Sequence, residues 1–296
     1  MIRAAMNRLC LLLVYLVSLG GASHAIDYTA LGAVKRLRTE KRYDEALQKL
    51  EALATQTNEA GENFSYLSQA LDIAVDSLKN ADRSLALAAA IKEPALRDFA
   101  KLRVLADFKR YDEALTFVSD KQVASWPTRV LGQAHGILAT IYHEKKDAAA
   151  ELAQWQLAAA APGAEVGVRG RALREAGVLF QKQGNAAKAE EQFRQALKVT
   201  PSNYAWRVES LISLSRLLIE SQRAKEAVKA FEGTDFSKVT SVTARGNLLE
   251  AYARTLLAAG KKIKAIETFD QLLKLDLPAT WKARINQELD QMAEEF

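Results

Sequence analysis

The sequence predicts an all-α fold, an α-solenoid of about seven helical hairpins followed by one further helix, on three observations. Of the 296 residues, 49% are apolar and only 5 are Pro and 14 Gly, so good helix formers dominate. Apolar residues recur every three or four positions along most of the chain. A small-and-aromatic pair also returns twice at one constant offset, as Ala189 and Phe193, Ala227 and Phe231, and Ala265 and Phe269.

The segment from Met1 to Ala25 has the pattern of a cleavable secretory signal. Arg3 and Arg8 precede a mostly apolar run from Leu9 to Leu19, and small residues then lead to a cleavage position after Ala25. The alternative is an uncleaved membrane anchor, although the apolar run is shorter than the roughly 20 residues that a spanning helix needs. We therefore expect a periplasmic or secreted protein with no membrane span after cleavage.

Charge and cysteine content narrow the classes of partner and chemistry. Cys10, the only cysteine, lies in the signal segment, so disulfides and thiol chemistry are not expected in the remaining chain. Loss of Arg3 and Arg8 leaves 39 basic against 36 acidic residues and lowers the net charge from +5 to +3. Such a small excess argues against nucleic acid or a membrane surface as the partner.

Three hairpins are expected in the first part of the chain. The first covers Ile26 to Thr57, the second pairs a helix from Asn63 to Lys79 with one from Ala81 to Ile91, and the third covers Ala95 to Val123. The heptapeptide KRYDEAL at positions 41–47 returns unchanged at positions 109–115, a separation of two repeats. An identical run of this length indicates internal duplication with one hairpin between the copies.

The remaining chain continues the pattern and ends in a different kind of helix. Hairpin four covers Thr128 to Ala161, hairpin five covers Gly170 to Asn203, and the last two repeat hairpin five at the constant offset. After Pro278, a helix from Ala279 to Glu295 has one apolar side, made of Trp281, Ile285, Leu289 and Met292. An open stack needs such a terminal element with one apolar and one wet side, so this helix is expected to cap it.

Hairpin five resembles the tetratricopeptide repeat. Its residues Gly177, Phe180, Gly184, Ala189, Phe193, Ala196 and Pro201 have the spacing of that family's motif, while Leu173 and Ala176 stand where the family usually has Trp and Leu. The resemblance implies hairpins stacked into a right-handed superhelix whose concave inner surface binds peptides or partner proteins. The constant offset between the last three hairpins is longer than the family's usual repeat, by about one helical turn or a longer connection.

We find no strong motif for catalysis or for a cofactor. The chain has no G-x-S-x-G, no H-E-x-x-H, no Gly-rich phosphate loop and no paired cysteines, so we expect neither enzymatic activity nor a cofactor. His135 and His143 are eight residues apart on one expected helix, about 80° around it and roughly 12 Å along it. They are too far apart to share a metal ion, and we predict no metal site.

The resemblance places a partner-binding face mainly on the first helix of each hairpin. There it would present Lys35, Arg103, Arg174, Arg216 and Arg254, with His135, Tyr142 and Glu250 nearby. Because Arg216 and Arg254 are separated by the same constant offset, they would form successive steps of a basic ladder. Guanidinium groups pair bidentately with carboxylates, so an acidic segment or a carboxyl terminus is the expected ligand. The alternative is that these arginines pair with neighbouring glutamates in place.

Three functions follow as expectations. The favoured one is a non-enzymatic scaffold that binds a peptide or partner protein in its concave groove, in assembly or quality control of the cell envelope. A second is a structural subunit of a secretion, pilus or polysaccharide-export machine that uses its convex face. A third is an enzyme or enzyme subunit with an unrecognised site.

Trp206 is expected to pack between hairpins rather than to contact a ligand.

Overall fold

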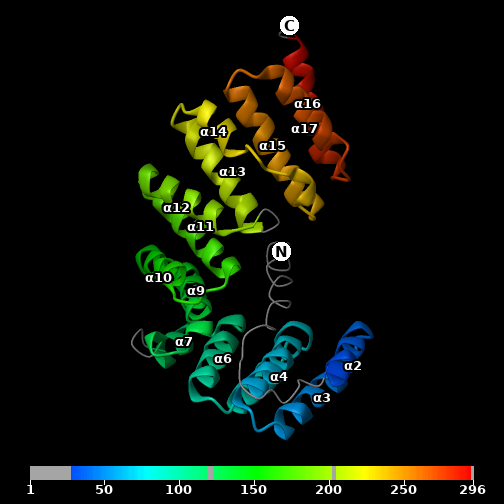
Figure 1. Cartoon of the computed structure of the whole chain (residues 1–296), viewed down its shortest axis with the longest axis vertical. Helices are drawn as coiled ribbons and strands as arrows, with labels where there is room; N and C mark the ends of the chain where they lie inside the picture. The colour runs from blue at the N-terminus through cyan, green and yellow to red at the C-terminus, as the bar shows by residue number, and fades with distance from the viewer. Residues whose placement is uncertain (1–27, 119–122, 202–204, 295–296) are drawn as a thin grey trace. The chain divides into compact units, whose positions relative to one another are not determined.

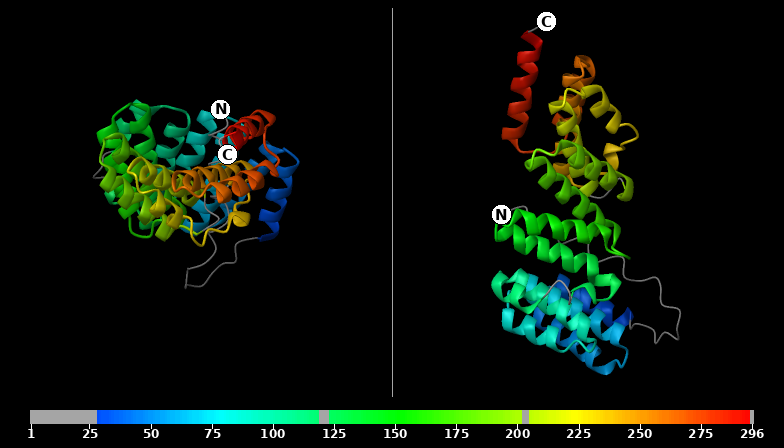
Figure 2. Two further views of the ribbon diagram at one scale, coloured as in Figure 1. Left: turned by 90° about the horizontal axis from the view of Figure 1, so that it is seen from above. Right: turned by 90° about the vertical axis from the view of Figure 1, so that its left-hand side faces the viewer.

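The computed structural model describes residues 28–118, 123–201 and 205–294, and their regular structure is entirely helical, as the sequence predicts (Figure 1). The expected signal segment, Met1 to Ala25, lies outside these ranges. The chain divides into two compact units, Met1–Pro94 and Ala95–Phe296, which are described separately. Figure 2 shows the helices from two further sides.

The first unit contains two hairpins. Its helices are α2 (Tyr28–Thr39), α3 (Tyr43–Gln56), α4 (Ala60–Asp72), the π-helical turn η2 (Ile73–Ser77) and α5 (Ala81–Ala89). The helix expected from Asn63 to Lys79 is thus α4 continued by a π turn. Buried Asn63 donates to the carbonyl of Ala54 at 3.1 Å and accepts from the backbone N–H of Lys92 at 2.9 Å. These bonds join the first turn of α4 to the end of α3 and to the residue that follows the second hairpin.

The second unit contains the other five hairpins and the final helix. Its elements are α6 (Pro94–Asp107), α7 (Tyr111–Phe117), α9 (Thr128–Glu144), α10 (Ala148–Ala160), α11 (Val166–Lys182), α12 (Ala186–Val199), α13 (Ala205–Glu220), α14 (Ala224–Ala230), η3 (Phe236–Lys238), α15 (Val242–Ala258), α16 (Lys262–Leu273) and α17 (Ala279–Glu294). In Figure 1 the hairpins from α9 to α16 follow one another from green to orange.

The same turn closes every hairpin that the structure describes. One residue with φ between +53° and +75° stands directly before the residue that caps the second helix. These residues are Lys41, Lys79, Lys109, Lys146, Gly184, Gln222 and Gly260. The cap residue's backbone N–H donates back to the first helix, as in Arg42 to Leu37 and Asn185 to Phe180, both at 2.9 Å. The recurrence confirms seven hairpins.

The duplicated heptapeptide has the same structure in both places. Lys41 and Lys109 each have φ of 60°, and α3 and α7 begin two residues later. Arg42 Nε donates to Glu45 at 2.7 Å, and Arg110 Nε donates to Glu113 at 2.8 Å. The hairpin α4–η2–α5 lies between the two copies in the chain, as their separation predicts.

Successive first helices contact each other in the second unit. α9 packs on α11, α11 on α13 and α13 on α15, while α10, α12 and α14 each pack against the first helix of the next hairpin. The repeated alanine and phenylalanine positions lie at the contacts within hairpins. Five of these residues are completely buried, namely Ala189, Phe193, Ala227, Ala265 and Phe269. The four first helices therefore form one continuous layer, here called the first-helix face.

The extra length of the repeat does not extend the sixth hairpin's second helix. α14 has only 7 residues, and Phe231 caps its end. The chain then takes an irregular path to Val242 that contains the single 3₁₀ turn η3. In this repeat the additional length lies in the connection between hairpins.

The final helix α17 covers the apolar end of the last hairpin. Ile285 and Met292 are buried in one cluster with Leu249 of α15 and with Phe269 and Leu272 of α16. Trp281 and Leu289 pack against the same cluster. The four apolar residues that predicted a cap therefore do face the stack.

Candidate partner-binding surface

The seven predicted site residues lie on first helices, but their side chains have different surroundings. Arg103 lies on α6, His135 and Tyr142 on α9, Arg174 on α11, Arg216 on α13, and Glu250 and Arg254 on α15. The half-buried Arg103 pairs with Asp107 one turn later at 3.6 Å, and Tyr142 is also half-buried. Lys35 is exposed on α2 in the first unit.

Arg254 is engaged by two glutamates of its own chain. Its Nη1 and Nη2 atoms each lie 2.9 Å from a carboxylate oxygen of Glu288 on α17, and its Nε and Nη2 atoms donate to Glu250 at 3.1 and 3.0 Å. This bidentate geometry is the one a guanidinium would offer to a ligand. Arg254 therefore pairs with glutamates of its own chain, which is the alternative that the sequence leaves open for these arginines.

Glu250 is the centre of that network. Arg284 of α17 donates to both of its oxygens, at 2.9 and 2.8 Å, and the indole Nε1 of Trp281 donates at 2.7 Å. Burial acts to raise the pKa of Glu250, but the hydrogen bonds from Arg284, Trp281 and Arg254 prevail and lower it below its ordinary value. Glu250 thus fastens the terminal helix to α15.

Arg174 is also paired, across two neighbouring first helices. Its Nη1 lies 2.8 Å from Glu175 on the same helix, and its Nη2 lies 3.4 Å from Glu209 on α13. Its Nε is buried without a hydrogen-bond partner. Arg216, in contrast, is exposed on α13 and makes no ion pair among the described residues. Of the two predicted ladder positions, Arg216 is the one with a free guanidinium.

His135 is buried, although the family resemblance places it beside the partner-binding face. Only 5% of the residue is exposed, and its Nδ1 lies 2.8 Å from Oε1 of Gln154 on α10. His143, on the same helix, lies 3.1 Å from the carboxylate of Glu151. The eight-residue spacing turns the two rings to different surroundings, so His135 stabilises the α9–α10 contact instead of presenting an imidazole to a ligand.

A further cation, which the sequence pattern does not single out, lies beside Arg174. The guanidinium carbon of Arg171 on α11 is 4.9 Å from the ring centre of Trp155 on α10 and 5.4 Å from that of Trp206 on α13. The Nε of Arg171 is buried without a hydrogen-bond partner. Burial lowers the pKa of Arg171, and Glu175 offsets this in part. Trp206 does pack between hairpins, as expected, and it does so against this cation.

Arg171 lines a small recess between α9, α10 and α11. The recess has a volume of about 200 Å³ and is lined by Thr140, His143, Glu151, Trp155, Arg171, Glu175, Val178, Leu179 and Lys182. Both lining carboxylates already have donors. Glu151 accepts from the indole of Trp155 at 3.3 Å and lies 3.1 Å from His143, while Glu175 pairs with Arg174.

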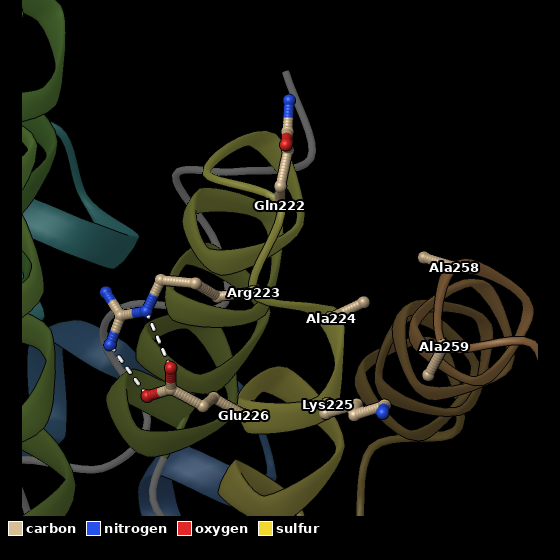
Figure 3. A pocket seen from close by; sticks show the side chains of 7 residues that line it. All are labelled: Gln222, Arg223, Ala224, Lys225, Glu226, Ala258 and Ala259. Carbon is tan, nitrogen blue, oxygen red and sulfur yellow. Dashed lines mark hydrogen bonds and ion pairs between the residues drawn. The ribbon is translucent and has the colours of Figure 1, made fainter.

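A second recess, of about 480 Å³, lies between the turn before α14 and the end of α15 (Figure 3). Ala224, Ala258 and Ala259 line it, and Arg223 turns toward Glu226. Arg223 also donates to Glu190 of the preceding hairpin at 2.6 Å. Its charge is thus satisfied within the chain.

Within residues 28–118, 123–201 and 205–294, no three side chains of His, Cys, Asp or Glu lie together as a metal site would require. In those ranges, every helix is also too short or too polar to span a bilayer.

Comparison with known proteins supports the repeat assignment. A family model described as tetratricopeptide repeat matches residues 171–203, and no curated protein matches the chain. The crystal structure of BtubC (BKLC) from P. vanneervenii is similar at 17% identity and a TM-score of 0.52, over 74% of this chain and 92% of that one. A tetratricopeptide repeat protein from Parabacteroides merdae ATCC 43184 matches at 13% identity and a TM-score of 0.44, over 87% and 96%. The first likeness shows a shared fold, and proteins built from such repeats generally bind other proteins.

Proposed function

We propose that this chain is a non-enzymatic scaffold that binds a peptide or a partner protein along the first-helix face of its second unit. The observation that carries the proposal is the continuous layer made by α9, α11, α13 and α15, on which Arg216 is exposed without an ion pair to any described residue. A free guanidinium on such a face is a ready donor to a carboxylate of a bound segment. An acidic partner is therefore the class that fits best.

The proposed setting is the cell envelope, in assembly or quality control of exported proteins. Its support is the charged, apolar and small-residue pattern of Met1 to Ala25 and the lack of cysteine after Cys10. Export of the full chain from a bacterial host tests the setting. Recovery from the periplasm with Ile26 as the first residue is expected, whereas a chain retained intact in the cytoplasm would contradict it.

The binding face is tested by charge reversal. The full chain with a carboxyl-terminal affinity tag is used to capture proteins from envelope extract, beside Arg216→Glu and a control, Lys198→Glu, which reverses an exposed charge on α12. Partners identified by mass spectrometry should be lost with Arg216→Glu and kept with Lys198→Glu. Equal capture by all three proteins would contradict binding through this face. Arg254 is unsuitable for this test, because its reversal would also break the contact with Glu288.

A second candidate function is a structural part of a larger envelope machine, with contacts through the second helices. The observation that favours it is the exposure of large apolar residues there, Ile263 at 72% on α16 and Leu157 at 46% on α10. A large exposed apolar side chain on a second helix would add buried apolar area to a contact with a partner. Ile263→Asp should abolish capture under this function and leave it unchanged under the first, so that variant and Arg216→Glu separate the two.

A further inference from the structure

The guanidinium of Arg171 is held by neighbours that satisfy none of its hydrogen-bond donors. Trp155 of the preceding hairpin, itself only 3% exposed, and Trp206 of the following hairpin both lie close to the guanidinium carbon, at 4.9 and 5.4 Å. Aromatic rings stabilise a cation through their faces and fix its position, but they accept no conventional hydrogen bond. The side chain is therefore positioned while its N–H groups have no hydrogen-bond partner among the described residues.

The nearby carboxylates do not pair with Arg171. Glu175 and Glu209 are both within ion-pair distance of Arg174, at 2.8 and 3.4 Å, one turn further along α11. Arg171 has no hydrogen bond or ion pair with any described residue, and its Nε is buried without a partner. Because an arginine side chain stays protonated in proteins, this site holds a positive charge with unused donors.

The recess beside Arg171 has the size and the cationic side chains to hold a small negatively charged group. Its volume of about 200 Å³ suits one side chain or one chain end rather than a drug-sized ligand. Lys182 adds a second positive charge to the lining, and the two lining glutamates are each engaged by donors of this chain. Aliphatic Val178 and Leu179 provide an apolar wall for the rest of a bound residue.

We infer that Arg171, with Trp155 and Trp206 at its sides, binds a carboxylate of the partner in this recess. The inference rests on the proposed binding function and identifies the position on the first-helix face that anchors the ligand. A planar guanidinium offers two parallel N–H groups to a carboxylate, and the partly dry site strengthens the bond. The carboxylate belongs either to a Glu or Asp side chain or to the carboxyl terminus of the partner.

Three fluorescent peptides separate these sources on the full chain. The first contains alternating Glu and Leu and has an amidated end, the second replaces every Glu by Gln, and the third is the Gln peptide with a free carboxyl terminus. Binding is followed by fluorescence anisotropy and by the tryptophan emission of the protein. We expect the first or the third peptide to bind at least tenfold more tightly than the second. The peptide that does so identifies the source of the carboxylate.

Variants then assign the binding to Arg171. Arg171→Met keeps an apolar side chain between the two rings and removes the charge, and it should weaken the carboxylate peptide at least tenfold. Arg171→Lys should give an intermediate loss, because the charge remains without the planar fork. Lys198→Gln, the control on α12, should bind as the parent does. Circular dichroism and thermal unfolding verify that each variant is folded.

If Arg171→Met does not fold, an NMR measurement on the parent protein still tests the inference. In ¹⁵N-labelled protein, the Nε–H resonance of Arg171, assigned by its absence in Arg171→Lys, should shift on addition of the carboxylate peptide and not of the Gln peptide. The inference is overturned if this resonance does not move, if Arg171→Met binds as the parent does, or if no peptide shows carboxylate-dependent binding at millimolar concentration. Capture from envelope extract judges the proposed function separately, since it depends on Arg216 and on no synthetic peptide.

Discussion

The ring of Phe193 occupies the space that a side chain at Gly177 would need. A Cβ built on Gly177 would lie 2.6 Å from one ring carbon of Phe193 and 2.8 Å from the next. Phe193 is completely buried on α12, and Gly177 is on the facing helix α11. The close approach of the two helices therefore depends on the absence of a side chain at position 177.

Gly177→Ala should destabilise the protein despite the better helix propensity of alanine. Overpacking a filled core costs about 1 to 3 kcal/mol, and the gain in propensity is about 1 kcal/mol, so we expect a net loss of up to about 2 kcal/mol. Urea unfolding measures it. Gly32→Ala is the matched control, because nothing lies within 4 Å of its added Cβ, and it should be neutral or stabilising. Equal effects of the two substitutions would contradict the packing explanation.

Phe231→Ala should be the more damaging core substitution. Phe231 is 4% exposed, and its ring centre lies 4.9 Å from that of Tyr252 on α15 and 6.5 Å from that of Phe236. Loss of a buried Phe side chain costs about 3 to 5 kcal/mol. Phe236→Ala, at a half-buried position in the same cluster, should cost less. A loss below about 1 kcal/mol at position 231 in urea unfolding would contradict the assigned packing.

Lys146→Gly should stabilise the turn between α9 and α10. Lys146 has φ of 61°, a left-handed conformation that costs a non-glycine residue about 1 kcal/mol, and Gly184 occupies the equivalent place in the next hairpin. We expect a gain of up to about 1 kcal/mol in thermal or urea unfolding. The reverse substitution, Gly184→Ala, should cause a similar loss. The explanation fails if both substitutions change stability in the same direction.

Acid should loosen the contact between α15 and α17. Because the folded-state pKa of Glu250 lies below its ordinary value of 4.5, its contribution to stability is present above about pH 4.5 and is lost as the pH falls through the lowered folded value. Trp281 donates to this carboxylate, so its emission should change in that acid range. Glu250→Gln should abolish this change. An identical acid transition in that variant would assign the effect to other carboxylates, such as Glu190, whose pKa is also lowered.

The hairpins and their facing stripes could be predicted because local sequence determines them. Ala189 and Phe193 occupy equivalent places to Ala227 and Phe231, and this register is visible at a fixed offset. A second register, of glycines, has the same spacing. The offset, or twice the offset, separates three glycines of first helices, Gly132, Gly170 and Gly246. A Cβ added to any of them would approach the connection that follows its hairpin. The distance would be 2.9 Å from Gly132 to Ala164 and 3.1 Å from Gly246 to Leu277.

Which arginines remain free could not be predicted, because their partners come from distant parts of the chain. Arg254 and Arg216 are equivalent by offset, yet Glu288 on α17 reaches only Arg254. Arg171 was missed because Trp155 and Trp206 approach it only after three hairpins stack. A signal was available nonetheless. Arg171 lies one turn before Arg174, so the two share a helix face.

The fastening of α17 has a consequence for a shortened chain. A protein ending at Pro278 would leave Leu249, Phe269 and Leu272 without the cover of Ile285 and Met292, and would leave Glu250 without Arg284. Its last hairpin would then present the kind of surface that each hairpin offers to the next one along the chain. We expect copies of the shortened protein to associate through that surface, which the last helix covers in the full chain.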